Sequence, residues 1–155
     1  MKAVIQRAES ASCTVEGKIT GAIDKGLVIY FGVDRGDDES MLPKFIDKML
    51  RLRIFEDENG KMNLSIKDAG GGILFISQFT LSADVYHGNR PSFDSAESPE
   101  KAYSMYQKAA EMIRKEGIKT ELGVFGAHME IRYMNPGPAT FILDSEKMPG
   151  LKDRH

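Results

Sequence analysis

The stretch Ile73-Leu74-Phe75-Ile76-Ser77-Gln78-Phe79-Thr80-Leu81 decides the fold of this chain. Its high content of apolar and β-branched residues is typical of a buried β-strand. The glycine-rich turn 68–72 precedes this strand, and the polar segment 82–98 follows it as a long loop. Because one buried strand lies between two segments of helical periodicity, the sequence predicts a domain in which helices pack on a sheet.

A helix is predicted on each side of this strand, because apolar residues recur there at the i, i+3, i+4 spacing. In the first helix these residues are Leu42, Phe45, Ile46, Met49 and Leu50. In the second helix they are Tyr103, Tyr106, Ala110 and Ile113. The second helix is expected to begin at Pro99, with Ser98 as its cap, and to end at Glu116-Gly117.

Short strands are predicted toward both ends of the chain. They are the segments 2–8, 11–15, 19–23, 26–33, 118–122, 127–134 and 139–144. The first four are expected to form a β-meander, Asn59-Gly60 marks a further hairpin, and residues 145–155 are interpreted as a tail. This order predicts a single α/β (α+β) domain over residues 1–155, with mixed or antiparallel sheets and two main helices.

Composition limits the classes of function. The chain has 155 residues, of which 41% are hydrophobic and 28% charged, and its formal net charge is −2. This balance argues against a broad basic surface for long nucleic acids, but it permits contact with a small part of one. Cys13 is the single cysteine, and no segment reaches the roughly 18–20 apolar residues of a membrane span. A cytoplasmic protein without a membrane partner is expected.

Few side chains suggest conventional catalysis. Cys13 could be a nucleophile, but a predicted strand without a neighbouring base favours a buried, inert thiol. His87, His128 and His155 lack the spacing of metal ligands, so neither a metal nor another cofactor is expected. Thr80 is not followed by a recognisable base, and no side-chain triad can be inferred around it.

The polar residues at the end of the buried strand allow two interpretations. In a strand, Ser77 and Phe79 would point to one face, and Gln78 and Thr80 to the other. Polar groups placed there either bind a ligand or satisfy one another in the core. In the following loop, Arg90 and Phe93 could hold a phosphate and a base, or they could belong to an ordinary rigid loop.

The segment Asn135-Pro136-Gly137-Pro138 is a rigid turn between two predicted strands. Its two prolines remove two backbone N–H groups but leave the carbonyls as acceptors. Such a turn suits the binding of an ammonium or a hydroxyl group. Its chemistry would therefore lie in the backbone.

Together, Ser77-Gln78-Phe79-Thr80-Leu81, Arg90-Pro91-Ser92-Phe93 and Asn135-Pro136-Gly137-Pro138-Ala139-Thr140 resemble motifs of the D-aminoacyl-tRNA deacylase family. The opening Met1 to Arg7 and the order of elements match as well, so the resemblance covers essentially the whole chain. One departure is Pro136, where the family commonly has a polar residue such as Asp. We expect this proline to stiffen the turn and to leave the function intact.

The resemblance implies a homodimeric enzyme that hydrolyses the ester of D-aminoacyl-tRNA, and of glycyl-tRNA mischarged on a non-cognate tRNA. Gly137-Pro138 would be a cis peptide that enters the partner's site, binds the α-amino group of the substrate and excludes L side chains. Catalysis would fall to backbone groups near Phe79 and Thr80 and to the ribose 2′-OH of the 3′-terminal adenosine.

The other residues that the resemblance assigns are binding residues. Ser77, Gln78 and Phe79 would shape the pocket for the adenosine and the amino acid, and Arg7 would brace the Gly-Pro turn. Two alternatives stay open, namely a module that binds tRNA ends without hydrolysis and a hydrolase of other D-amino-acid esters.

Overall fold

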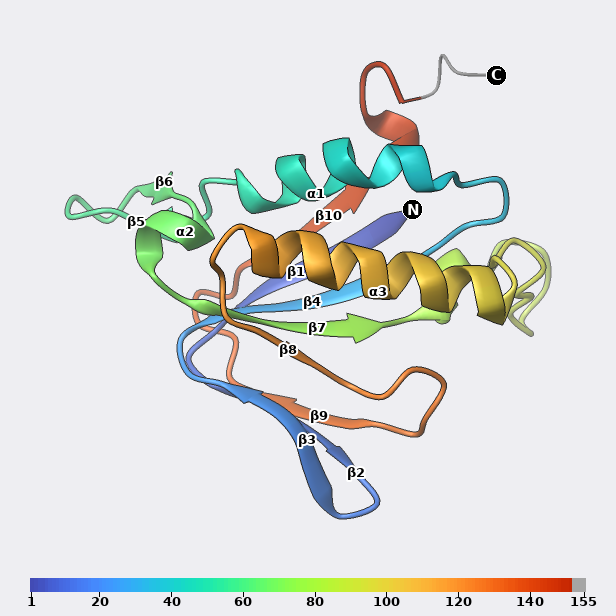
Figure 1. Ribbon diagram of the computed structural model, residues 1–155, viewed down its shortest axis with the longest axis horizontal. Coiled ribbons are helices and arrows are strands. Elements are labelled where there is room, and N and C mark those ends of the chain that lie inside the picture. The colour runs from blue at the N-terminus through green and yellow to red at the C-terminus, as the bar shows by residue number, and fades with distance from the viewer. Residues whose placement is uncertain (152–155) are drawn as a thin grey trace.

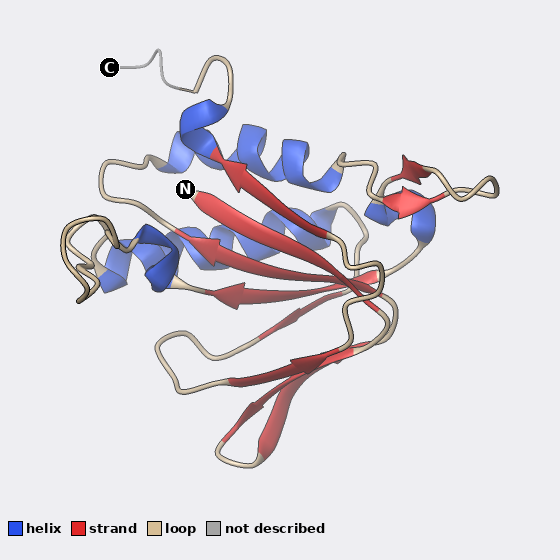
Figure 2. Cartoon of the chain, turned by 180° about the vertical axis from the view of Figure 1, so that it is seen from behind, coloured by secondary structure: helices blue, strands red, loops and turns tan. Residues whose placement is uncertain are grey.

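The computed structural model describes residues 1–151 and has three layers (Figures 1 and 2). The middle layer is a five-stranded sheet in the order β10 (Thr140–Asp144), β1 (Lys2–Ala8), β4 (Gly26–Gly32), β7 (Gly72–Ser77), β8 (Thr120–Leu122). Helices α1 (Leu42–Leu50) and α3 (Pro99–Lys115) cover one face of this sheet. A second sheet lies on the other side, in the order β3 (Lys18–Ile23), β2 (Ala11–Val15), β9 (Glu130–Tyr133).

The central sheet is mixed, which confirms the predicted fold class. Strand β1 lies antiparallel between β10 and β4, whereas β4 and β7 are parallel neighbours. The pairing order differs from a β-meander, because β1 pairs with β4 and the β2–β3 hairpin belongs to the second sheet. The nearly continuous burial of β4 explains this order, since a strand with two apolar faces needs a layer on each side.

The helical layer buries the larger hydrophobic core. All five residues predicted for the apolar face of α1 are buried, as are Tyr106, Ala110 and Ile113 of α3. The prediction is wrong for Tyr103, which is 44% exposed and packs against Phe125, with 5.1 Å between ring centroids. Ser98 occupies the N-cap of α3, but its side chain makes no capping hydrogen bond.

A smaller core fills the space between the two sheets. It contains Cys13 together with Val28, Leu74 and Ile76 from the central sheet. The Cys13 thiol is fully buried, which fits a packing role better than that of a nucleophile.

The remaining elements lie at the ends of the sheet. The hairpin predicted at Asn59-Gly60 is formed by β5 (Phe55–Glu56) and β6 (Met62–Leu64), and the short helix α2 (Ile66–Ala69) follows it. The 3-10 turn η1 (Glu39–Met41) precedes α1. The predicted tail is wrong where it is described, because η3 (Ser145–Lys147) follows β10 and both Met148 and Leu151 are buried. The rest of that segment, including His155, lies outside the described residues.

Candidate functional site

The polar end of the central strand forms a tight turn, not a continued strand. Strand β7 ends at Ser77, and the 3-10 turn η2 (Phe79–Ser82) follows, which corrects the prediction of a strand through Leu81. Gln78 is the pivot, with φ −146° and ψ 84°, and its N–H donates to the carbonyl of Phe31 at 2.8 Å. Gly32 permits this approach, because a Cβ there would lie 2.7 Å from the carbonyl oxygen of Gln78.

The turn leaves two backbone donors without an acceptor. Leu81 N–H donates to the carbonyl of Gln78 at 3.3 Å, which closes the turn. The N–H groups of Phe79 and Thr80 come earlier in it and have no acceptor within residues 1–151. The side chains of Phe79 and Thr80 are both exposed, so this part of the chain faces solvent.

Thr80 is not part of a side-chain triad in the described residues. Its hydroxyl accepts a hydrogen bond from the Gln78 carboxamide, and no carboxylate or imidazole of the described chain bonds to it. A nucleophilic hydroxyl needs a general base within hydrogen-bonding reach. Within the described residues, this hydroxyl therefore has no partner that could act as a general base.

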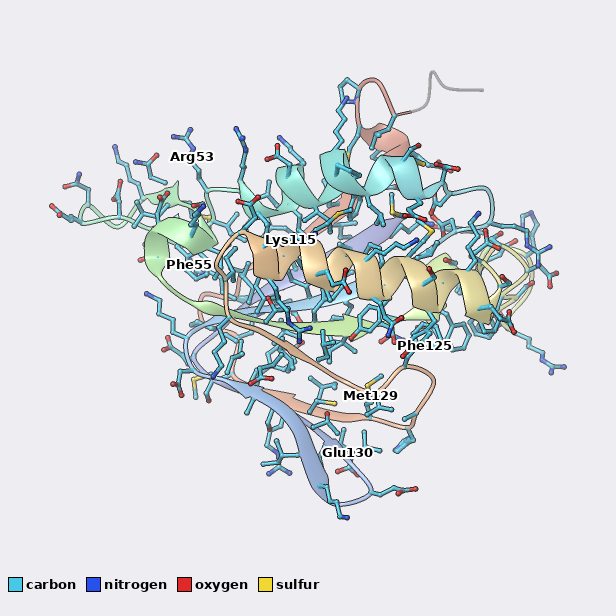
Figure 3. All side chains as sticks on the ribbon, in the orientation of Figure 1. Arg53, Phe55, Lys115, Phe125, Met129 and Glu130 are labelled. Carbon is cyan, nitrogen blue, oxygen red and sulfur yellow. The ribbon has the colours of Figure 1, made fainter. Side chains whose placement is uncertain are left out.

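A cavity of about 240 Å³ opens beside the turn. Ser77, Gln78 and Phe79 lie along its wall, whereas Thr80 does not line it. Phe125 and Met129 also line it, and Figure 3 shows them on the segment between β8 and β9, below helix α3. The lining is largely aromatic and aliphatic, with a few polar side chains among them, as is typical of a small-molecule site.

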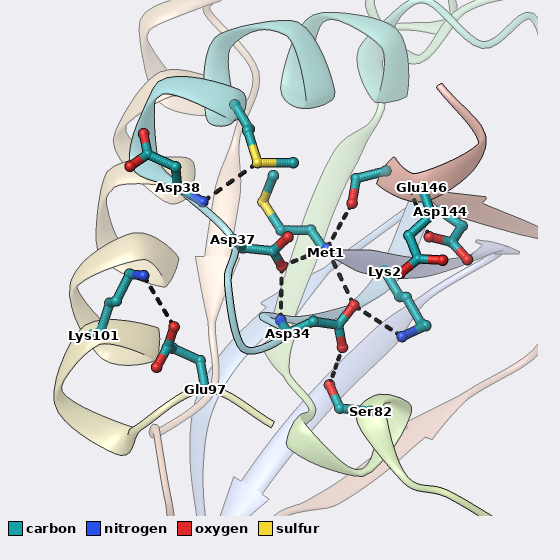
Figure 4. A network of polar contacts seen from close by, with 12 residues as sticks. Met1, Lys2, Asp34, Asp37, Asp38, Ser82, Glu97, Lys101, Asp144 and Glu146 are labelled. Atoms are coloured by element: carbon teal, nitrogen blue, oxygen red, sulfur yellow. Dashed lines mark hydrogen bonds and ion pairs between the residues drawn. The ribbon is translucent and has the colours of Figure 1, made fainter. Parts of the chain in front are cut away.

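The η2 turn is anchored to the start of the chain through Asp34 (Figure 4). One carboxylate oxygen of Asp34 accepts from the Ser82 hydroxyl, and the other accepts from Lys2 Nζ at 2.9 Å. The α-amino group of Met1 lies 3.3 Å from the same oxygen. Burial alone would raise the pKa of Asp34, but these hydrogen bonds and positive charges outweigh it and hold the pKa below its usual range.

The long loop places an aromatic ring against the turn. Phe93 meets Phe79 edge to face, with 5.2 Å between ring centroids, and both rings stay partly exposed. A short bridge between Asp84 and Ser92 closes the loop. Arg90 is exposed at its tip, which leaves both interpretations of that residue open.

The Gly-Pro turn lies beside Arg7. The peptide bond between Gly137 and Pro138 is cis, and Gly137 has φ +120°, a conformation that favours glycine. The buried Arg7 guanidinium donates from Nη2 to the carbonyl of Pro136 at 3.2 Å and from Nη1 to the carbonyl of Ile54 at 3.3 Å. A Cβ on Gly137 would lie 2.7 Å from Nη2, so a side chain there would require the guanidinium or the turn to shift.

The η2 turn and the Gly-Pro turn lie at opposite ends of the central sheet. Ser77 is in register with Phe31, which pairs with Ala3 near the start of β1. Arg7, near the end of β1, donates its backbone N–H to the carbonyl of Ala139. The distance from Ala3 to Arg7 is about 13 Å at about 3.3 Å per residue. One protomer therefore does not bring the two turns together.

The described residues contain no group of three or more His, Cys, Asp or Glu side chains that could hold a metal ion. Within the same residues, no helix has the length and apolar character needed to cross a membrane.

Comparisons with known proteins agree over nearly the whole length. The family described as D-Tyr-tRNA(Tyr) deacylase matches residues 4–144. A D-aminoacyl-tRNA deacylase of Koribacter versatilis is 50% identical over 147 residues, which cover 95% of this chain and 99% of the relative. A D-aminoacyl-tRNA deacylase of Thermotoga petrophila is 47% identical over 148 residues, which cover 96% and 99%.

Solved structures share the fold. A c-Myc DNA unwinding element binding protein has a TM-score of 0.85 at 41% identity, with 93% of this chain and 98% of that chain covered. A probable eukaryotic D-amino acid tRNA deacylase has a TM-score of 0.80 at 17% identity and shows the fold alone, covering 92% and 97%. The matches define a hydrolase that acts on an ester bond. The chain belongs to the D-Tyr-tRNA(Tyr) deacylase family.

Sequence reasoning named Arg7 beside the Gly-Pro turn but missed the other side chains that hold the two turns. Asp34 and Ser82 are 48 positions apart, and nothing in the local pattern links them. The only sequence signal for this contact was the position of Asp34, directly after the predicted buried strand 26–33. Asn135 was quoted as part of a motif, but its side chain was given no role.

Proposed function

We propose that this enzyme hydrolyses the ester that joins a D-amino acid to the 3′-terminal adenosine of tRNA. The observation that carries the proposal is the pair of unbonded N–H groups of Phe79 and Thr80 beside a cavity of about 240 Å³. The family and the relatives' names support the substrate class. We place the reaction in the cytoplasm, where charged tRNA is used, and in a single domain.

The proposed chemistry relies on backbone donors. Water attacks the ester carbonyl, the C–O bond to the ribose 3′-oxygen breaks, and that oxygen takes up a proton. The negative charge that develops on the carbonyl oxygen needs pre-placed donors, and the N–H groups of Phe79 and Thr80 can supply two. The ribose 2′-OH of the substrate assists in positioning the water. No cofactor is required for this reaction.

The cavity would hold the terminal adenosine. Phe79 and Phe125 offer aromatic faces, and base stacking on such faces is favourable for any base. Ser77 and Gln78 provide hydrogen-bonding groups along the same wall. In this arrangement the ester bond lies next to the η2 turn.

We propose that a second copy of the chain completes the site. Within one protomer, the Gly-Pro turn and the η2 turn are separated by about 13 Å along β1, so they cannot contact the same substrate group. Strand β10 is an edge strand with Ile142 76% exposed, and the Gly-Pro turn leads directly into it. Covering such an apolar edge with a second protomer would bury it and carry each turn toward the partner.

In the dimer, the turn would act as a filter for chirality. The carbonyls of Gly137 and Pro138 accept no hydrogen bond within the described chain, so they are free to bind the α-ammonium of the substrate. With the ammonium fixed, an L side chain would meet the Gly-Pro backbone, whereas a D side chain would point away. Glycyl-tRNA has no side chain to exclude and should be cleaved as well.

The proposal is tested with D-Tyr-tRNA, L-Tyr-tRNA and glycyl-tRNA made on a non-cognate tRNA. We expect release of D-Tyr and Gly, with little release of L-Tyr, and a dimer by light scattering. Equal rates for both enantiomers would refute the filter, and a fully active monomer would refute the shared site.

Tight tRNA binding without release would indicate a binding module. Equal kcat/KM for small D-amino-acid esters lacking adenosine would indicate a different hydrolase.

A further inference from the structure

The Gly-Pro turn is closed by hydrogen bonds from the Asn135 side chain. Pro136 and Pro138 have no N–H, so ordinary backbone hydrogen bonds cannot close the turn at those positions. The Asn135 carboxamide instead closes the turn by hydrogen bonding to the backbone of Ala139. Its Oδ1 accepts from the Ala139 N–H at 2.9 Å, and its Nδ2 donates to the Ala139 carbonyl at 3.2 Å. One amide thus pairs with both backbone groups of a single residue.

The orientation of this carboxamide is determined by its partners. A flipped amide would place Nδ2 against the Ala139 N–H and Oδ1 against the Ala139 carbonyl, which opposes like with like. Nδ2 also lies 3.4 Å from Thr140 Oγ1, and Gln6 Nε2 donates to that oxygen at 3.0 Å. Asn135 is therefore held by contacts with β10, and Thr140 connects it to β1.

The two exposed residues of the turn are held from both sides. Before them, the Pro136 carbonyl accepts from Arg7 Nη2 at 3.2 Å. After them, Ala139 is paired with Asn135 and also accepts from the Arg7 backbone N–H at 3.3 Å. Gly137 and Pro138 lie between these clamps, and their carbonyls accept nothing from residues 1–151. Within the described residues, the hydrogen bonds that orient this pair are those of the flanking clamps.

We propose that Asn135 is a positioning residue that sets enantiomer selectivity by orienting the Gly137 and Pro138 carbonyls. The inference rests on the function proposed above. The Arg7 guanidinium holds the carbonyl of Pro136 before the turn, and the Arg7 backbone N–H holds the carbonyl of Ala139 after it, but neither contact binds the N–H of Ala139. The Asn135 amide supplies this further constraint. Without it, the carbonyls can rotate away from the substrate ammonium, and the L side chain is no longer driven into the backbone.

The test compares Asn135→Ala and Asn135→Asp with the wild-type enzyme on D-Tyr-tRNA and L-Tyr-tRNA. The first variant removes both contacts with Ala139. The second keeps the size and the acceptor, but it loses the donor to the Ala139 carbonyl. Misplacement by about 1 Å can cost a hundredfold in rate, so we expect the D-to-L ratio of kcat/KM to fall by about tenfold or more in both.

The D-to-L ratio separates positioning from stability. Both rates are measured on one preparation, so the folded fraction cancels from the ratio. The matched control is Asn63→Ala, which removes a surface contact with Arg53 of 3.0 Å on β6, and it should retain the wild-type ratio. If Asn135→Ala fails to fold, the Asn135→Asp variant decides the question.

Failure of this inference is distinguishable from failure of the proposed function. If Gly137→Ala collapses the ratio while both Asn135 variants keep the wild-type value, the positioning role is refuted and the filter stands. If the wild-type enzyme cleaves both enantiomers equally, the filter and the positioning role fall together. A lower ratio in the Asn135 variants, with an unchanged control, supports the inference.

Discussion

Gly137→Ala perturbs the Gly-Pro turn by a single methyl group. Gly137 has φ +120°, and a non-glycine residue in such a conformation costs about 1–3 kcal/mol. The added Cβ would lie 2.7 Å from Arg7 Nη2 and 3.2 Å from the Ala139 nitrogen. Arg7 is buried and bonded to Ile54, so it cannot move aside without losing a contact. The turn and the guanidinium must therefore separate.

The separation should appear both in catalysis and in stability. A displacement of about 1 Å in a positioning group costs about a hundredfold, and we expect that loss in kcat/KM for D-Tyr-tRNA. Urea unfolding should show a loss of about 1–3 kcal/mol from the backbone alone. Deacylation is followed by release of labelled amino acid, with light scattering to check the dimer.

Gly60→Ala is the matched control for Gly137→Ala. Gly60 has φ +72° in the β5–β6 hairpin, and a Cβ there would meet nothing within 4 Å. This variant should lose stability to a similar extent while keeping full deacylase activity. Wild-type activity and wild-type D-to-L selectivity in Gly137→Ala would refute the argument, because a side chain would then be tolerated against the guanidinium.

Three further predictions concern other side chains of the site. Thr80→Ala removes an exposed hydrogen bond with Gln78 that is worth about 0.5–1.5 kcal/mol. We therefore expect kcat to fall by about tenfold at most. Complete loss of activity with intact tRNA binding would indicate a threonine nucleophile. In Arg7→Lys, a single ammonium cannot reach the carbonyls of both Ile54 and Pro136. We expect the free energy of unfolding in urea to fall by about 1–3 kcal/mol and the D-to-L ratio of kcat/KM to fall as well. An unchanged ratio would contradict the bracing role of Arg7. The pKa of Asp34 is depressed in the folded state, so its contribution to stability is present above the unfolded pKa of about 3.9 and is lost as the pH falls through the folded value. Asp34→Asn should flatten that acid limb in unfolding titrations, and an unaltered limb would exclude this linkage.

The sequence predicted the layers of the fold because hydrophobic periodicity reports burial directly. The apolar face of α1 and the buried strand from Ile73 to Ile76 follow from spacing alone. Pairing order did not follow, since β1 and β4 are separated by a hairpin that has the same local pattern. Met148 and Leu151 were missed because two isolated apolar residues after the last strand carry no period.

The site was predictable only as motifs. Ser77 to Thr80 and Gly137-Pro138 were identified, but the end of β7 at Ser77 was not, because the turn depends on the Gln78 contact with Phe31. That contact joins residues far apart in the chain, and a one-dimensional pattern does not encode it. Periodicity therefore located the strand that leads to the site, while the direction of the donors required the three-dimensional structure.

The groups proposed to act on the substrate are backbone N–H and C=O groups; a proline substitution removes an N–H, and no substitution removes a C=O. Mutational sensitivity should consequently lie in the side chains that orient the backbone and not in a general acid or general base that transfers a proton to the substrate. Asp34 and Ser82 aim the η2 turn, while Arg7 and Asn135 aim the Gly-Pro turn. Because the Asp34 carboxylate is held ionised well into the acid range, activity near neutral pH should not follow its titration. A steep activity change near neutral pH would instead report the substrate's own α-amino group, whose charged form the Gly137 and Pro138 carbonyls would bind.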